Sequence, residues 1–212
     1  MKQRQKQQSQ NQKATARKAS PPANRKGSAS QLRIIGGQWR SRRLPVASVP
    51  GLRPTPDRVR ETLFNWLQSE VPGSRCLDLF AGSGALGFEA LSREAAQVVL
   101  VEKHPAAFAQ LQANVTALQA ECAELINRDA LVYLKSEPEP FDLIFLDPPF
   151  RKGFVDQVMS LITERGLLKA DGLIYLEYEA GLEPDFSQWG MLPRRETTAG
   201  QVVSVLLQQA ES

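Results

Sequence analysis

The sequence Asp147-Pro148-Pro149-Phe150, which directly follows the apolar run 141–146, is the segment best suited to carry out chemistry. Two consecutive prolines remove two backbone donors and leave the Asp147 carboxylate and the Pro148 carbonyl as neighbouring acceptors. Such a pair can accept both N–H hydrogens of an exocyclic amine and turn the nitrogen lone pair toward an electrophile. Phe150 offers a ring on which a flipped base can stack. We predict that these four residues are catalytic; a rigid proline turn without function is the alternative.

A glycine-rich turn follows the apolar run 75–80. Gly82, Gly84 and Gly87 match the spacing G-x-G-x-x-G between a strand and a helix, where glycine lets the backbone approach a ligand closely. This pattern alone also fits a dinucleotide. Asp78, four positions before the first glycine, would repel a pyrophosphate but attract the positively charged amino-acid part of S-adenosylmethionine. The sequence therefore favours S-adenosylmethionine as the cofactor.

Carboxylates also follow the next two predicted strands. Glu102 can accept both ribose hydroxyls of an adenosyl ligand, although NAD would use the same group. Asp129 can accept the adenine amino group, or it can instead cap the helix that follows. The residues predicted to bind the cofactor are Asp78, Phe80, Gly82, Gly84, Glu102, Asp129 and Ala130.

Strand-like and helix-like segments alternate after Pro72-Gly73, which is typical of a parallel sheet covered by helices on both faces. Strands are expected near 75–80, 97–102, 123–127, 141–146 and 172–178, and helices near 85–93, 105–119, 129–135 and 153–165. The segments 189–197 and 200–208 predict an antiparallel C-terminal hairpin. The sequence thus predicts one doubly wound α/β domain over residues 71–212.

Residues 31–70 are expected to form a small β-hairpin and a helix that bind RNA. The predicted hairpin turns around Gly36-Gly37, and its tip bears Trp39, Arg40, Arg42 and Arg43. An aromatic among arginines can stack on RNA, but Trp39 can equally pack the hairpin onto the domain.

The helix of this region is expected to extend to about Ser69. Thr55 is suited to cap it, Pro56 to occupy its first position and Asp57 to face its positive end. The stripe Val59, Leu63, Trp66 and Leu67 predicts its buried face, with Arg58 and Arg60 away from that face.

The 212 residues suffice for one domain, and their charge is divided unevenly. Residues 1–60 hold fifteen Lys and Arg and one acid, whereas the rest hold eleven Lys and Arg and twenty-two acids. A basic arm on an acidic domain indicates a polyanionic partner such as nucleic acid, and a solubilising tail is the alternative. Residues 1–30 hold only one large apolar residue, Met1, and are expected to be disordered.

The chain has no apolar run long enough to span a membrane and no apolar segment after its basic start. We therefore expect a cytoplasmic protein without a membrane partner. Cys76 and Cys122 are too few for a disulfide framework or a zinc site, and both are interpreted as buried thiols. We expect no bound metal, and we expect a monomer.

These motifs resemble those of class I S-adenosylmethionine-dependent amino-methyltransferases over about residues 75–208. The segments 33–40, 52–55 and 57–67 resemble the bacterial RsmD family in particular. The resemblance implies a Rossmann-like class I methyltransferase fold with a mostly parallel seven-stranded sheet. It also implies methylation of a guanine N2 in 16S rRNA, of the guanine 966 type, in the small ribosomal subunit.

The resemblance places Arg53, Thr55 and Arg58 near the substrate entrance. Arg151 follows the proline motif and can contact an RNA phosphate, or can belong to a solvated loop. With the hairpin residues, the predicted substrate contacts are Trp39, Arg40, Arg42, Arg43, Arg53, Thr55, Arg58 and Arg151.

A DNA adenine-N6 methyltransferase is the main alternative, because it must orient the same kind of exocyclic amine. The chain offers little surface outside the catalytic domain for reading duplex DNA. A non-catalytic RNA-binding module and a nicotinamide oxidoreductase are weaker alternatives, because the first leaves the intact Asp147 motif unexplained and the second leaves both that motif and Asp78 unexplained.

Overall fold

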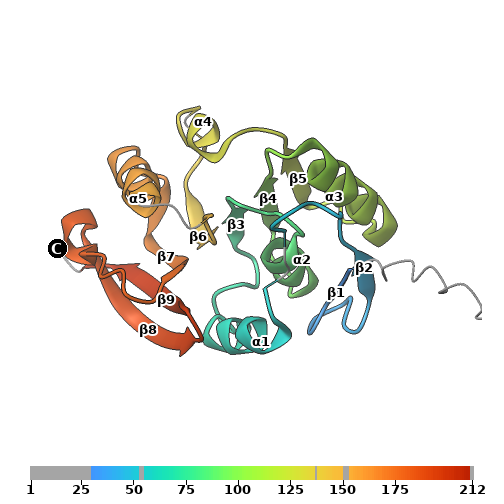
Figure 1. Cartoon of the computed structure of the whole chain (residues 1–212), viewed down its shortest axis with the longest axis horizontal. Helices are drawn as coiled ribbons and strands as arrows, with labels where there is room; N and C mark the ends of the chain where they lie inside the picture. The colour runs from blue at the N-terminus through green and yellow to red at the C-terminus, as the bar shows by residue number, and fades with distance from the viewer. Residues whose placement is uncertain (1–29, 53–54, 137, 150–152, 211–212) are drawn as a thin grey trace, which may run out of the picture.

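A seven-stranded sheet with helices on both faces forms the body of the molecule (Figure 1). The computed structural model describes residues 30–52, 55–136, 138–149 and 153–210. The strand order is β5-β4-β3-β6-β7-β9-β8. The parallel strands are β3 (Arg75–Asp78), β4 (Gln97–Val101), β5 (Ala123–Ile126), β6 (Phe141–Leu146) and β7 (Leu168–Glu179). The antiparallel strands β8 (Met191–Ala199) and β9 (Val202–Gln209) close the sheet, which confirms the predicted α/β fold and its C-terminal hairpin.

Each face of the sheet carries its own hydrophobic cluster, because successive side chains of a strand point to opposite faces. Alternate residues of β6 show this division: Phe145 belongs to the cluster beneath α1 (Asp57–Trp66), α2 (Ala85–Ser92) and α3 (Pro105–Leu118). Ile144 belongs to the other cluster, beneath α4 (Ala130–Leu134), α5 (Phe154–Glu164) and the short 3-10 helix Phe186–Trp189. The central strands are thus buried on both faces, which explains their continuous apolar sequences.

The N-terminal hairpin packs onto the first of these faces. Strands β1 (Gln31–Arg33) and β2 (Arg43–Pro45) pair antiparallel, and their buried residues join the same cluster as α1 and α2. Arg43 lies in β2 itself and not at the tip of the hairpin, contrary to the prediction. The amides of Gln38 and Trp39 donate to the carbonyl and to the side-chain hydroxyl of Ser92, at the end of α2, and these bonds fix the turn.

Helix α1 differs from its prediction in three respects. It ends at Trp66 and not near Ser69, and Pro56 is its N-cap residue, with no side-chain cap from Thr55. Leu63 and Leu67 of the predicted stripe are buried and Trp66 packs against the same cluster, as expected. Arg60 and Phe64 are buried as well, so the buried face is wider than predicted. The Phe64 ring lies 5.9 Å from that of Phe145.

Two further predictions differ from the structure. Strand β7 begins at Leu168 and not near 172, because a register shift inserts extra residues opposite the start of β6. Cys76 is buried as expected, but Cys122 is exposed, because it lies in the turn before β5 and not in the strand.

No helix in the described part of the chain is long and apolar enough to cross a membrane. The predicted disordered arm falls almost entirely on residues 1–29, outside the described residues.

Candidate active site

The predicted site residues meet where the strand order of the sheet reverses. Strand β3 lies between β4 and β6, and the chain after β5 crosses to the other side of β3 to form β6. Asp78 ends β3, Glu102 follows β4 and Asp147 follows β6, so all three lie at the carboxyl edge of the sheet. Crevices at such reversal points are where open α/β sheets bind ligands. Motifs that are far apart in the sequence therefore lie together at one edge of the sheet.

The turn between β3 and α2 brings backbone close to the cleft. Gly82 and Gly84 have φ values of +52° and +77°, a region that favours glycine. A Cβ atom on Gly82 would lie 2.8 Å from the Leu52 side chain, and one on Gly87 would lie 3.1 Å from Oδ2 of Asp78. The glycines therefore permit a backbone course that side chains would obstruct.

Asp78 is a buried carboxylate with a backbone donor. The amide of Gly87 donates to Asp78 Oδ2 at 2.9 Å, and Asp78 is only 4% exposed. Burial raises the pKa of Asp78 to about 7, the Gly87 hydrogen bond opposes this rise, and the nearby Glu102 charge adds to it. A cationic group in the cleft would favour the ionised form of Asp78.

Glu102 fastens the glycine turn to the next strand. Its Oε2 accepts from the amide of Gly82 at 2.9 Å and its Oε1 accepts from the amide of His104 at 2.6 Å. These bonds hold the carboxylate in one orientation at the cleft edge. Each oxygen keeps a second lone pair, so the carboxylate can still accept two hydroxyl groups.

Asp129 and Phe80 border the same cleft. Asp129 caps α4 by accepting from the amide of Leu131 at 3.0 Å, as the capping alternative predicts, while its side chain stays 45% exposed. Ala130, the first residue of α4, is buried. The half-buried Phe80 ring packs 5.7 Å from that of Phe154, at the start of α5.

Asp147 lies beside an acidic residue that the sequence reasoning missed, Glu177 of β7. Leu146 and Leu176 are partners in the β6–β7 register, so Asp147 and Glu177 follow them at adjacent positions. The hydroxyl of Tyr175 donates to Glu177 Oε1 at 2.6 Å. Burial, followed by the charges of Glu177 and Asp78, raises the pKa of Asp147 to about 8. An acidic residue inside the otherwise apolar run 173–178 was the available sequence signal.

This arrangement fits an adenosyl cofactor with a cationic amino-acid part. The glycine turn lets a ligand approach the protein backbone closely. The buried carboxylate of Asp78, with its single described donor, suits the ammonium group of such a ligand. The carboxylate of Glu102, with its free lone pairs, suits the ribose hydroxyls. No group of three or more His, Cys, Asp and Glu side chains is placed to hold a metal ion among the described residues.

A buried carboxylate anchors the N-terminal segment to α2. Glu89 of α2 accepts from the amides of Ile35 and Gly36, both at 2.8 Å. It also pairs with Arg60 and with Arg93. The hairpin and α1 are therefore held on the same face of the sheet as α2.

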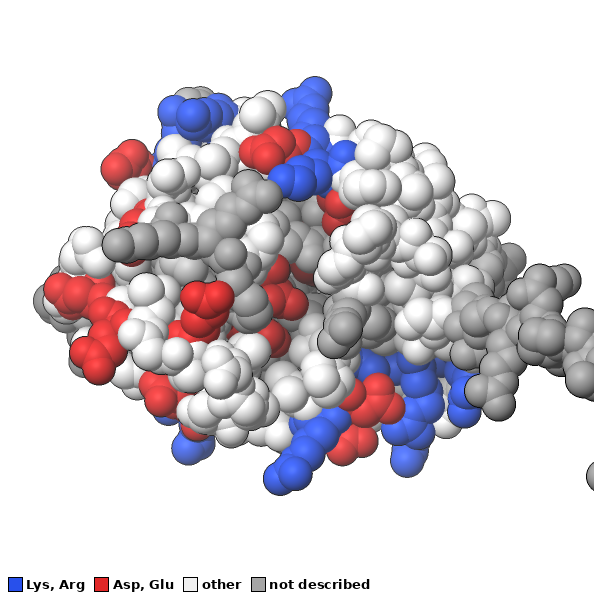
Figure 2. All heavy atoms as spheres, viewed as in Figure 1, with Lys and Arg blue, Asp and Glu red and all other residues white. Residues whose placement is uncertain are grey.

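The predicted substrate residues divide into two groups. Arg40, Arg43 and Arg58 are exposed, and Figure 2 shows Lys and Arg side chains along the edge of the molecule near α1 and the hairpin. Acidic side chains gather around the hollow in the middle of the same view (Figure 2). Arg42 is exposed but donates to the carbonyl of Ala117, and Thr55 is buried. The remaining predicted residues, Arg53, Phe150 and Arg151, lie outside the described residues.

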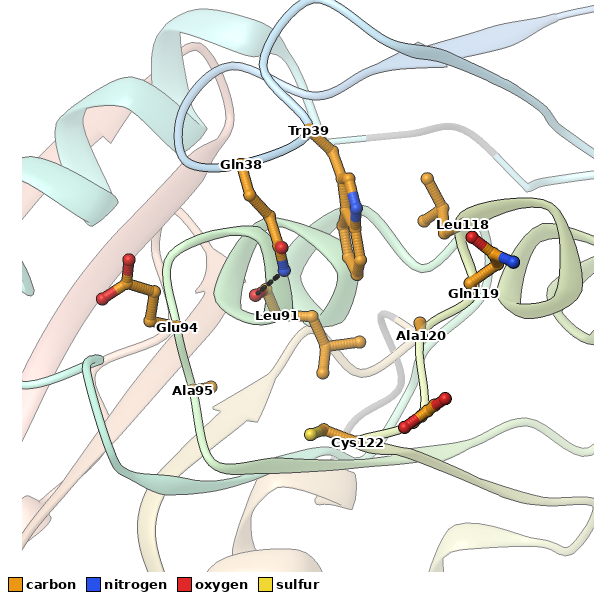
Figure 3. Close-up of a pocket in the computed structure, with 10 residues that line it drawn as sticks. Gln38, Trp39, Leu91, Glu94, Ala95, Leu118, Gln119, Ala120 and Cys122 are labelled. Carbon is orange, nitrogen blue, oxygen red and sulfur yellow. Dashed lines mark hydrogen bonds between the residues drawn. The ribbon is translucent and has the colours of Figure 1, made fainter.

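Trp39 points into a surface pocket far from the cleft (Figure 3). The pocket is also lined by residues that precede β4 and β5, so it lies at the amino edge of the sheet, opposite the cleft. The half-buried indole packs against the cluster beneath α2, which agrees with the packing interpretation of Trp39.

Comparison with known proteins assigns the chain to a family. A family model described as "Conserved hypothetical protein 95" matches residues 32–208. Ribosomal RNA small subunit methyltransferase D of Escherichia coli K12 is 48% identical over 188 residues, which cover 88% of this chain and 93% of the relative. The chain belongs to the RsmD family. The Haemophilus influenzae RsmD relative is 47% identical over 186 residues, which cover 84% of this chain and 94% of the relative.

Solved structures agree with this placement in the RsmD family. The Escherichia coli protein yhhF superimposes with a TM-score of 0.78 at 46% identity, over 86% of this chain and 100% of that chain. A methyltransferase fold complexed with SAH, 18% identical, superimposes with a TM-score of 0.57 over 71% of this chain and 48% of that chain. The second likeness shows that the fold is shared.

Proposed function

We propose that this RsmD-family protein transfers a methyl group from S-adenosylmethionine to the exocyclic N2 of a guanine in 16S rRNA. The target would be of the guanine 966 type, in free rRNA or in an assembling small ribosomal subunit. The observation that carries the proposal is the position of Asp147 and Pro148, which follow β6 beside the glycine turn of β3. The names of the relatives, ribosomal RNA small subunit methyltransferase D, support rRNA as the acceptor.

S-adenosylmethionine, when bound, supplies a methyl group on a positively charged sulfur. Asp78 and the glycine turn would hold its amino-acid part, Glu102 its ribose and Asp129 its adenine. Phe80 and Ala130 would line the same side of the cleft.

Asp147 and the Pro148 carbonyl would accept the two N–H hydrogens of the guanine amine. This orientation makes the nitrogen lone pair available and aims it at the methyl group. The amine loses one proton once the new bond has formed, so no strong base has to act first. The ionised form of Asp147 can accept that proton, and its raised pKa of about 8 makes it a stronger base than an ordinary carboxylate.

The exposed arginines of the hairpin and α1, Arg40, Arg43 and Arg58, would contact rRNA phosphates. These contacts position the RNA without reading its sequence. Their place on an anchored hairpin and on α1, outside the cleft, suits a large structured RNA or ribonucleoprotein better than free nucleosides.

The experiment that tests this function uses the full chain, labelled S-adenosylmethionine and three acceptors: unmodified 16S rRNA, unmodified small subunits and duplex DNA. Nucleoside analysis should find N2-methylguanosine in one or both RNA samples, and the better acceptor reveals the assembly stage. N6-methyladenine in DNA would instead support the alternative, a DNA adenine methyltransferase. Absence of transfer to any acceptor, despite cofactor binding, would contradict the proposal.

A further inference from the structure

Glu177 is a buried carboxylate next to Asp147, where the proposed function places the substrate base. It is 7% exposed, and the β6–β7 register sets it next to Asp147. Its register partner on β9 is Ser204. The Tyr175 hydroxyl donates to Glu177 Oε1 at 2.6 Å. This bond fixes the orientation of the carboxylate.

The pairing of Glu177 is incomplete, unlike that of the other deeply buried glutamate. Glu89 receives two backbone amides and two arginines, which satisfy both of its oxygens. In the described part of the chain, Tyr175 is the one donor to Glu177, and no described arginine or lysine pairs with it. No fully buried side-chain oxygen among the described residues lacks a partner, so the second oxygen of Glu177 is reached by solvent beside Asp147 and is free to accept from a ligand that brings a donor.

We propose that Glu177 contacts the substrate base, accepts the N1–H of guanine and thereby selects guanine over bases with an unprotonated ring nitrogen. Tyr175 acts through Glu177 as a positioning residue. The inference rests on the proposed function and deepens it, because it names the group that recognises the base.

The hydrogen-bonding edge of guanine explains the selectivity. Guanine presents N1–H directly beside its N2 amine, so both groups are donors. Adenine and cytosine instead present a ring-nitrogen acceptor beside the exocyclic amine. With Asp147 and Pro148 accepting from the amine, a second carboxylate at the neighbouring position attracts N1–H and repels a lone pair. A site built this way rejects the wrong base by leaving its own buried polar group unpaired.

The alternative is that Glu177 is a neutral residue of the core, held by its hydrogen bond with Tyr175. Burial raises the pKa of Glu177, which is compatible with either role. The two roles predict different effects of substitution. Substituting a core residue changes the methylation of all bases equally, whereas substituting a residue that contacts the base changes the preference between bases.

The test uses small subunits in which the target guanine is replaced by 2-aminopurine. This base keeps the reactive 2-amino group but has an unprotonated N1. For the wild-type protein we expect kcat/KM for guanine to exceed that for 2-aminopurine by at least about 10-fold, the value of one hydrogen bond to a charged group. In Glu177→Gln, whose amide can donate to N1, we expect this ratio to fall by at least about 10-fold.

Two further variants complete the design. Tyr175→Phe removes only the hydroxyl that holds Glu177, and we expect the ratio to fall by a smaller factor. Glu164→Gln changes an exposed carboxylate at the end of α5, on the other face of the sheet, and should leave the ratio unchanged. Thermal melting and binding of S-adenosylhomocysteine verify that each variant is folded.

The outcomes separate this inference from the proposed function. If the wild-type protein makes N2-methylguanosine but the ratio is the same in Glu177→Gln, Glu177 is a core residue and the inference is wrong. Equal methylation of guanine and 2-aminopurine by the wild-type protein would also overturn it. If the wild-type protein makes no N2-methylguanosine, the proposed function fails, and this inference fails with it.

Discussion

Arg60 of α1 and Glu89 of α2 form an ion pair from which solvent is excluded at both ends. Nη1 of Arg60 lies 3.4 Å from Oε2 of Glu89, and the two side chains are 1% and 0% exposed. Arg60 also donates to the carbonyl of Arg33 at 2.9 Å and of Thr55 at 3.1 Å. This pair therefore connects the N-terminal hairpin, α1 and the helix that follows the glycine turn.

Loss of one partner of this pair should destabilise the fold strongly. In Arg60→Met the buried negative charge of Glu89 loses one of its positive partners. We therefore expect the free energy of unfolding to fall by about 3–5 kcal/mol. For a chain of this size that is a fall in Tm of roughly 10 °C. Arg58→Met, two positions earlier on the exposed surface, should leave Tm nearly unchanged. Equal Tm values for the two variants would contradict the structural role of the pair.

Asp147→Ala should abolish methyl transfer and spare cofactor binding. The carboxylate would contact the base and not the cofactor, so we expect activity to fall by at least about 100-fold while the Kd for the cofactor changes only a few-fold. Filter-binding assays and calorimetry with S-adenosylhomocysteine measure the two quantities. A large loss of cofactor affinity would show that Asp147 belongs to the cofactor site instead.

Asp147→Asn should stabilise the protein in a pH-dependent way. The pKa of Asp147 is raised from 3.8 to about 8 in the folded protein. Between these pH values the carboxyl is ionised only in the unfolded chain, which stabilises the unfolded state and lowers the stability of the wild-type protein as pH rises. At pH 4 the variant should match the wild type, and its Tm advantage should grow up to about pH 8 and then level off. Scanning calorimetry at pH 4, 6 and 8 measures this difference, and a constant Tm difference would refute it.

Binding of the cofactor should release a proton from Asp78. Its pKa of about 7 means that much of the free protein carries a neutral carboxyl at pH 6.5. A cofactor ammonium group favours the ionised carboxylate, so affinity should rise with pH through this range. Titration calorimetry at pH 6.5 in buffers of different ionisation enthalpy detects the proton, because an α-amino group titrates only near 7.7–8.0. Proton uptake at this pH would contradict the assignment of Asp78.

The hairpin arginines should contribute to RNA affinity through charge alone. Arg40→Ala and Arg43→Ala should each weaken RNA binding and reduce the slope of log K against log salt by about 1. Neither should alter cofactor affinity, because both side chains are exposed away from the glycine turn. Lys169→Ala, which removes an exposed lysine at the start of β7, is the matched control. A salt slope that stays the same in Arg40→Ala and Arg43→Ala would show that these residues do not contact phosphate.

Much of the fold follows from local sequence patterns. The apolar runs of the central strands, the glycine turn and the carboxylates after each strand predicted the sheet and its carboxyl-edge cleft, because strands buried on both faces have a simple signature. Asp78, Glu102 and Asp147 occupy that edge as expected. Their positions depend only on which strand they follow.

The burial of charged residues was decided by the tertiary structure. Arg60 was placed on the solvent side of its helix, yet it is buried, because the hairpin and α2 cover that side and Glu89 supplies a partner. Glu177 went unnoticed because its significance depends on Asp147, thirty positions earlier, lying on the adjacent strand. Sequence periodicity reports how one element divides between apolar and polar residues. Whether a charge is buried, and what it faces, depends on contacts between elements that are distant in the sequence.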